Sequence, residues 1–260
     1  MFFPLHDQNN EQVKTVPMAS YVVIGLCFLI HLYSVILGFG PTGRSDLTRF
    51  IYRHGLIPSV YFNDATTYHI GERRPQLTPE QRQILAENGF KGFPEPEMIE
   101  SSQLWVWLMP LTCMFLHASW MHLLTNLWFF WIFSDNVEER MGTLKFSLFY
   151  LFVGFFSSIA HAVIQSGSEI PLVGASGAVS GVMGAYLVLF PVNKITSYFC
   201  PVWFFIRRID VPAIVVLGFY LLLNMLQMYQ SGALGANIAF DAHIFGFLGG
   251  VGAASIFKRM

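Results

Sequence analysis

The sequence predicts an all-α fold, a polytopic membrane protein with six transmembrane helices. Apolar residues make up 54% of the chain and charged residues only 12%, whereas soluble domains average about 25% charged. A bilayer core of roughly 30 Å needs about 20 mostly apolar residues per helix. Six segments of about this length are present: 17–39, 118–134, 146–165, 172–190, 211–230 and 242–257.

These segments define one membrane domain, residues 17–257, between a cytoplasmic N-terminus at 1–16 and a cytoplasmic C-terminus at 258–260. A long polar outer loop, about residues 40–103, separates the first two segments and holds seven of the 15 Lys and Arg residues. Inside this loop, Thr78 as a helix cap and Gly89 as a helix stop predict a short surface helix.

Two further apolar runs are too short to cross a bilayer. Leu104 to Leu116 and Ile195 to Ile206 are each about a dozen residues long, and each contains a proline, Pro110 or Pro201. We expect both runs to be interfacial or re-entrant.

The basic residues predict the orientation of the chain. Short cytoplasmic loops of membrane proteins carry an excess of Lys and Arg. With six spans, all the basic residues of the short loops and tails fall on one side: Lys14, Arg140, Lys145, Lys194, Arg207, Arg208, Lys258 and Arg259. The loops at about 166–171 and 231–241 have none. We therefore expect an integral, multi-pass protein with both termini in the cytoplasm, in the cytoplasmic (inner) membrane of a prokaryote.

Three polar side chains share one predicted depth in the membrane. At about 1.5 Å per residue, Ser176, His243 and His122 each lie roughly 20–22 Å from the inner end of their own helix. That level is several ångströms below the outer surface. The preceding sequence QSGSE, residues 165–169, would reach it as non-helical backbone, which is tolerated only inside protein or beside water. We therefore expect Ser176 at the floor of a water-filled cavity.

The ionisable residues narrow the possible chemistry. No Asp or Glu lies inside the six segments apart from boundary residues such as Asp135 and Asp241. This excludes a membrane aspartyl protease and disfavours a proton-coupled carrier, and the absence of His-Glu-x-x-His excludes a zincin-type protease. A serine activated by a histidine base remains, and His243 fits the base. Asp241 points about 200° away from His243 on a helix, so we assign it to the helix start, where a carboxylate suits the dipole.

A serine nucleophile also needs donors for the oxyanion of its tetrahedral intermediate. His122 and Asn126 lie at i and i+4 on one helix face, and the backbone N–H of Ser176 lies at a helix N-terminus. The neighbouring small residues have another role, because glycines let membrane helices approach closely. We assign helix packing to Gly177, Gly181, Gly246 and Gly250.

Four motifs together resemble the rhomboid family of intramembrane serine proteases. They are Gly174-Ala175-Ser176-Gly177, Ala242-His243-x-x-Gly246-x-x-x-Gly250, His122-x-x-x-Asn126 and VEERMGTLKFSLFYL, and the resemblance covers roughly residues 104–257. It implies a Ser176–His243 dyad without a third carboxylate member and an oxyanion site from His122, Asn126 and the Ser176 amide. It also implies cleavage of single-span membrane proteins near the outer membrane face and structural roles for Glu138 and Arg140.

The sequence departs from the family pattern at two places. Family members often have a Trp-Arg pair before the second helix, but Trp105 and Trp107 have no adjoining arginine. Some members carry an aromatic residue one turn after the catalytic serine that stacks on the histidine, and Ser180 occupies that position here.

The expected partners are single-span transmembrane substrates and membrane lipid. We expect no cofactor and no metal. We also expect no nucleic acid, because the sequence has no basic face with interleaved aromatics. Its three cysteines, Cys27, Cys113 and Cys200, show no C-x-x-C spacing. Two other classes remain as alternatives. A catalytically silent relative that binds membrane clients would be expected to lose Ser176 or His243, and a solute channel or carrier should show intramembrane ionisable residues or inverted repeats.

Overall fold

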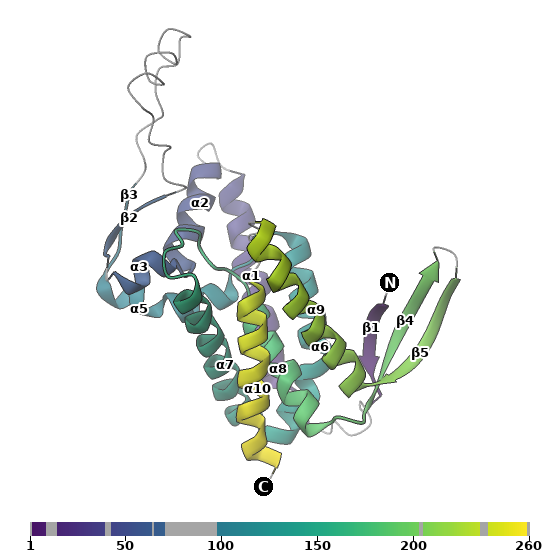
Figure 1. Ribbon diagram of the computed structural model, residues 1–260. Coiled ribbons are helices and arrows are strands. Elements are labelled where there is room, and N and C mark those ends of the chain that lie inside the picture. The colour runs from purple at the N-terminus through teal and green to yellow at the C-terminus, as the bar shows by residue number, and fades with distance from the viewer. Residues whose placement is uncertain are drawn as a thin grey trace.

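The computed structural model describes residues 2–8, 15–39, 43–63, 65–70, 98–202, 205–234 and 239–258, and it is mostly helical (Figure 1). Its helices are α1 (Met18–Gly38), α2 (Gly43–His54), α3 (Pro58–Phe62), α5 (Gln103–Thr112), the 3-10 turn η1 (Cys113–Phe115), α6 (Trp120–Met141), α7 (Thr143–Ile164), α8 (Ser176–Leu189), α9 (Ala213–Leu234) and α10 (Phe240–Lys258). Each of the six predicted apolar segments overlaps one helix, although α6, α7, α9 and α10 extend beyond the predicted bounds.

Length and composition identify the helices that suit a membrane. Within the described residues, α1, α7 and residues 213–230 of α9 are long and apolar enough to cross. The pair formed by Gln103–Phe115 and α6 meets the same test together but is bent by 79°, which makes three or four candidate spans. The apolar helices α8 and α10 are shorter. The chain is therefore an integral membrane protein, while the crossing of α6, α8 and α10 stays a prediction.

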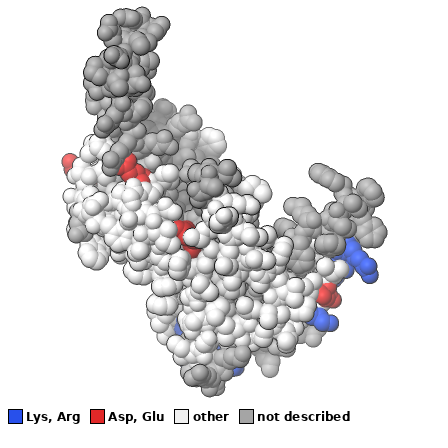
Figure 2. All heavy atoms as spheres, viewed as in Figure 1, with Lys and Arg blue, Asp and Glu red and all other residues white. Residues whose placement is uncertain are grey.

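The helices show the burial pattern of a protein that has lipid as its solvent. On α1, Leu29 and Ile36 are about 60% exposed, whereas Ser20, His31 and Ser34 are buried inside the bundle. Figure 2 shows a broad face almost without charged side chains. Polar groups in a bilayer must find partners within the protein, and this requirement explains why they point inward.

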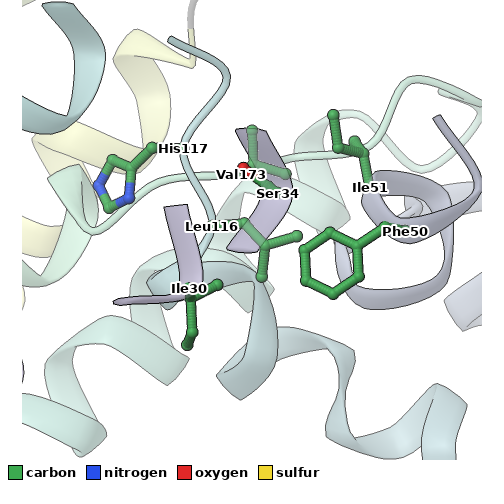
Figure 3. Close-up of a pocket in the computed structure, with 7 residues that line it drawn as sticks. All are labelled: Ile30, Ser34, Phe50, Ile51, Leu116, His117 and Val173. Atoms are coloured by element: carbon green, nitrogen blue, oxygen red, sulfur yellow. The ribbon is translucent and has the colours of Figure 1, made fainter. Parts of the chain in front are cut away.

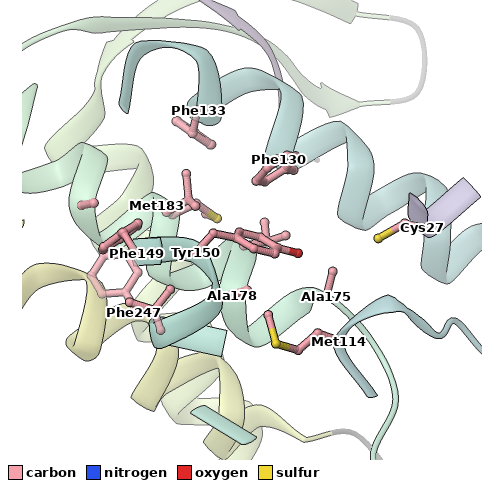
Figure 4. Packing of buried hydrophobic residues seen from close by; sticks show 14 of the residues in the cluster. Cys27, Met114, Phe130, Phe133, Phe149, Tyr150, Ala175, Ala178, Met183 and Phe247 are labelled. Carbon is pink, nitrogen blue, oxygen red and sulfur yellow. The ribbon is translucent and has the colours of Figure 1, made fainter. Parts of the chain in front are cut away.

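Helix α8 is the central element of the bundle. Every residue from Gly177 to Tyr186 is buried, and α6, α7 and α10 pack around it (Figure 1). On the side of α6 and α7, Phe133 packs edge-on against Tyr186 with ring centroids 5.0 Å apart. Phe130 and Tyr150 extend this aromatic packing (Figure 4). A helix buried on all sides gives its first residue a well-defined position.

Glycines allow α8 and α10 to touch backbone to backbone. A Cβ added at Gly246 would overlap the carbonyl oxygen of Gly177, and one added at Gly250 would overlap that of Gly181. Close approach of this kind depends on small residues at the contact. The four glycines assigned to packing therefore form two facing pairs.

Two small sheets make the all-α prediction wrong in part. Strands β1 (Phe2–Asp7), β4 (Lys194–Val202) and β5 (Phe205–Pro212) form an antiparallel sheet in the order β1-β4-β5, and β2 (Thr67–His69) pairs with β3 (Met98–Glu100). The described part of the apolar run 195–206, predicted to be interfacial or re-entrant, belongs instead to the antiparallel strands β4 and β5, which extend away from the bundle (Figure 1). Its β-branched and aromatic residues suit strands.

The N-terminal strand is attached to the bundle by a buried carboxylate. Asp7 Oδ2 accepts hydrogen bonds from Asn136 Nδ2 at 2.6 Å and from the Tyr186 hydroxyl at 2.7 Å. Asn136 belongs to α6 and Tyr186 to α8, so Asp7 joins β1 to both helices. A carboxylate buried in this way needs such donors.

The loop between the first two apolar segments is folded against the bundle where the structure describes it. It contains α2, α3, β2 and β3, while the predicted surface helix at 78–89 lies outside the described residues. The Trp105 indole N–H donates to the Arg53 carbonyl at 2.7 Å. Leu56 and Leu172 exchange two backbone hydrogen bonds at 3.0 and 2.8 Å. These contacts anchor the loop although Trp105 has no adjoining arginine.

Glu138 caps the first helix from the far end of α6. Helix α1 follows Pro17, which supplies no side-chain cap, so its first N–H groups need acceptors. The buried Glu138 carboxylate accepts from the Ala19 and Ser20 amides at 2.9 Å each, and from the Ser20 hydroxyl at 2.8 Å. This capping is a structural role of the kind implied for Glu138, whereas Arg140 is exposed.

We expect Glu138→Ala to lower the free energy of unfolding by about 3 kcal/mol, because buried donors left without an acceptor cost about 1–3 kcal/mol each. Glu138→Gln keeps one acceptor oxygen and should lose about half as much. Unfolding by SDS titration in mixed micelles measures both. Equal stability of the Ala variant and the wild type would contradict the capping role.

Candidate active site

Ser176 is the first residue of α8 and follows a non-helical segment. Residues 165–175 lie outside any helix, as predicted from the polar sequence before the serine. Gly174 has a φ of +130°, and a Cβ at this position would lie 2.8 Å from His122 Nε2. Only glycine adopts this backbone easily, so Gly174 lets the chain enter α8 directly beside His122.

His243 lies in the first turns of α10, next to the contact between α8 and α10. The facing glycines Gly177 and Gly246 follow Ser176 by one residue and His243 by three. His243 Nδ1 is 2.8 Å from Asn224 Oδ1. Among the described residues, no hydrogen bond joins His243 to Ser176. The structure thus brings the two helix ends together and gives His243 a different partner, on α9.

His122 and Asn126 occupy the first two turns of α6. Ser119 caps this helix, with its hydroxyl oxygen accepting from the His122 amide at 3.2 Å. The position that a Gly174 Cβ would take is 2.8 Å from His122 Nε2 and 3.7 Å from Ser176 Oγ, so His122 adjoins the serine. Asn126 is buried one turn further along, where its Nδ2 donates to the His122 carbonyl at 2.8 Å.

Two other histidines near the serine have no counterpart in the sequence analysis. Buried His117 lies before α6, and its Nε2 accepts from the Ala175 amide at 3.5 Å. His31 Nδ1 on α1 donates to the His117 carbonyl at 3.1 Å. These contacts join residues 58 and 86 positions apart. No local pattern in the sequence signals them.

Asp241 lies in the first turn of α10, at the helix start as predicted, and it has a partner that the sequence did not reveal. Its Oδ1 accepts from the Ala242 amide and from His161 Nδ1 on α7, both at 2.8 Å. Both side chains are buried. The carboxylate nearest to His243 in the sequence is therefore engaged by His161, which ties the start of α10 to α7.

Ser180, which replaces an aromatic residue of some family members, is also accounted for. Its hydroxyl is 2.6 Å from the hydroxyl of Tyr220 on α9. Tyr220 in turn lies 6.3 Å from Phe247 of α10, measured between ring centroids. An aromatic ring from α9 thus contacts both α8 and α10.

A small cavity borders the segment that leads into α8. Its lining is mostly apolar and comprises Ile30, Ser34, Phe50, Ile51, Leu116, His117 and Val173 (Figure 3). It does not open directly over Ser176, but His117 borders it and contacts Ala175. In the part of the chain that the structure describes, no three His, Cys, Asp or Glu side chains are grouped so that they could hold a metal ion.

Comparison with known proteins identifies the family. The rhomboid domain model matches residues 101–260. Rhomboid protease GluP of Bacillus subtilis (strain 168) is 32% identical over 164 residues, which are 63% of this chain and 28% of GluP. The putative rhomboid protease YdcA of the same organism is 30% identical over 146 residues, 55% of this chain and 64% of YdcA.

A third relative comes from a plant. Chloroplastic Rhomboid-like protein 11 of Arabidopsis thaliana is 40% identical over 75 residues, 29% of this chain and 26% of that protein. The chain spans less than two thirds of each of these three relatives. Because the rhomboid domain model covers well over half of its residues, the chain belongs to the rhomboid family.

Proposed function

We propose that the chain is an intramembrane serine protease. It hydrolyses peptide bonds of single-span membrane proteins near the outer membrane face, with Ser176 as nucleophile and His243 as base. One observation carries the proposal: in a rhomboid domain, Ser176 begins the buried helix α8 where it touches α10, the helix that holds His243. Two bacterial relatives bear the name rhomboid protease, which supports the same activity.

The proposed reaction has two stages. His243 Nε2 accepts the hydroxyl proton as Ser176 Oγ attacks the scissile carbonyl, and it then donates this proton to the leaving amine. A water molecule, activated by the same nitrogen, next hydrolyses the acyl-enzyme and restores the serine. A dyad without a carboxylate agrees with the engagement of Asp241 by His161.

The oxyanion of the tetrahedral intermediate is stabilised by nearby donors in this proposal. The Ser176 amide is among the first N–H groups of α8, which have no acceptor within the helix. His122 adjoins Ser176 across Gly174. Asn126 retains one amide hydrogen beyond the one bonded to the His122 carbonyl. Loss of one such donor typically slows catalysis by about 10²–10³.

The proposed topology has six spans and both termini in the cytoplasm of a prokaryotic cell. Ser176 begins α8, whereas Lys194 follows its other end, and Arg207 and Arg208 lie exposed on the adjoining β5. Figure 2 shows basic side chains at this hairpin. An excess of basic residues marks the cytoplasmic side, and this supports an outer position for Ser176.

A fluorophosphonate probe tests this function without knowledge of the substrate. We expect the purified wild type to be labelled and Ser176→Ala to remain unlabelled, while Ser147→Ala, on α7, reacts normally. Combined His122→Ala and Asn126→Ala should slow labelling by about 10²-fold or more, through loss of the oxyanion donors. A membrane-impermeant probe should reach the wild type from outside right-side-out vesicles.

Three outcomes would contradict the proposal. Labelling of Ser176→Ala would assign the nucleophile elsewhere, and labelling only from the cytoplasmic face would reverse the topology. A folded protein that binds a single-span client but takes up no probe would be a catalytically silent relative.

A further inference from the structure

Asn224 on α9 holds the imidazole of His243. Its side chain is only 5% exposed, and its Oδ1 lies 2.8 Å from His243 Nδ1. Its Nδ2 donates to the Tyr220 carbonyl at 2.9 Å. Because a carbonyl can only accept, the amide nitrogen must face Tyr220, and the amide oxygen must therefore face the imidazole.

This orientation determines which ring nitrogen of His243 carries the proton. An amide oxygen only accepts hydrogen bonds, so Nδ1 must be the donor. In a neutral imidazole the other nitrogen, Nε2, then has the free lone pair. That nitrogen is the one a base needs in order to accept a proton from Ser176.

The other polar groups near His243 do not compete for Nδ1. Asp241, on the same helix, is bonded to His161 of α7 and to the Ala242 amide. His122 of α6 lies on the Ser176 side, across Gly174. Tyr220, one turn before Asn224, places its hydroxyl on Ser180. Helix α9 thus contacts α8 through Tyr220 and α10 through Asn224.

We propose that Asn224 is a positioning residue of the active site: its side-chain oxygen keeps His243 in the Nδ1–H tautomer, with Nε2 available to Ser176. This inference rests on the proposed protease function. The amide takes the place that a carboxylate holds in a Ser-His-Asp triad, but it adds no charge. Since Asn224 belongs to α9, the orientation of the base depends on the position of that helix.

Substitutions at Asn224 separate positioning from mere packing. Asn224→Leu has a similar size but no acceptor, so kcat should fall about 10- to 100-fold with KM within a factor of two. Asn224→Asp restores the acceptor and should recover most of kcat. Its added charge favours the imidazolium, so the acid limb of the kcat/KM profile should move to higher pH. Gln227→Leu, the same kind of change on the exposed face of α9, should leave kcat and the pH profile unchanged.

A spectroscopic measurement reads the tautomer in the wild type, without any substitution at Asn224. In protein with ¹⁵N-labelled histidine, with His243→Ala used to identify the signal, the neutral His243 ring should show a protonated Nδ1 and an unprotonated Nε2. A protonated Nε2, wild-type kcat in Asn224→Leu, or an unshifted pH profile in Asn224→Asp would each overturn the inference. Absence of all Ser176-dependent cleavage together with the Nδ1–H signal would instead refute the proposed protease function.

Discussion

Ser176→Ala and His243→Ala should each reduce cleavage of a single-span model substrate to background. In a serine protease the nucleophile and its base act as a unit, so loss of either costs up to about 10⁶ in kcat. Neither side chain is central to packing: both are only partly buried, and the hydrogen bond between His243 and Asn224 contributes about 1 kcal/mol. Both variants should therefore keep a thermal midpoint close to that of the wild type.

Matched variants away from the site serve as controls. Ser147→Ala, on α7, and His69→Ala, exposed on β2, should cleave the same substrate at the wild-type rate. Cleavage is measured with purified protein and substrate reconstituted into liposomes. Substantial residual activity in either site variant would refute the dyad.

The second large effect is expected at the glycine contact between α8 and α10. In Gly246→Ala, the added methyl group overlaps the Gly177 carbonyl oxygen, a backbone atom that cannot rotate away. The helices must separate, and overpacking of this kind costs about 1–3 kcal/mol. Activity should fall further than stability, because the separation moves His243 away from Ser176.

Gly252→Ala is the matched control for this prediction. It lies on the same helix, and a Cβ there meets no atom within 4 Å, so it should retain the stability and cleavage rate of the wild type. Gly250→Ala should resemble Gly246→Ala in stability, because its methyl group overlaps the Gly181 carbonyl. SDS titration and the liposome cleavage assay measure both effects. An active, equally stable Gly246→Ala would show that the helices do not need this contact.

Several elements of the fold could be predicted from the sequence because their causes are local. A bilayer requires about 20 apolar residues per helix, and each of the six apolar segments overlaps a helix, although α8 and α10 are shorter than a full span. The rise of 1.5 Å per residue predicted that Ser176 and His122 share one level, and both adjoin Gly174 in the structure. The facing glycines of α8 and α10 were likewise predicted as packing residues.

The strands could not be located in this way. The β4–β5 hairpin was interpreted as an interfacial or re-entrant run because its apolar residues are too few to span a membrane. The third strand of this sheet, β1, pairs with β4 across more than 180 positions, for example between Asp7 and Ile195. Pairing at this separation depends on how the bundle brings the N-terminus beside the end of α8.

The sequence by itself determined the membrane class, the helix positions and the serine and histidine that could react, because lipid and helix geometry act on each segment separately. The tertiary structure decided which groups pair with one another: Asn224 with His243, His161 with Asp241, and Glu138 with the start of α1. A polar group inside a bilayer must be satisfied by protein. The need for a partner is therefore visible in the sequence, but its identity depends on which helices become neighbours.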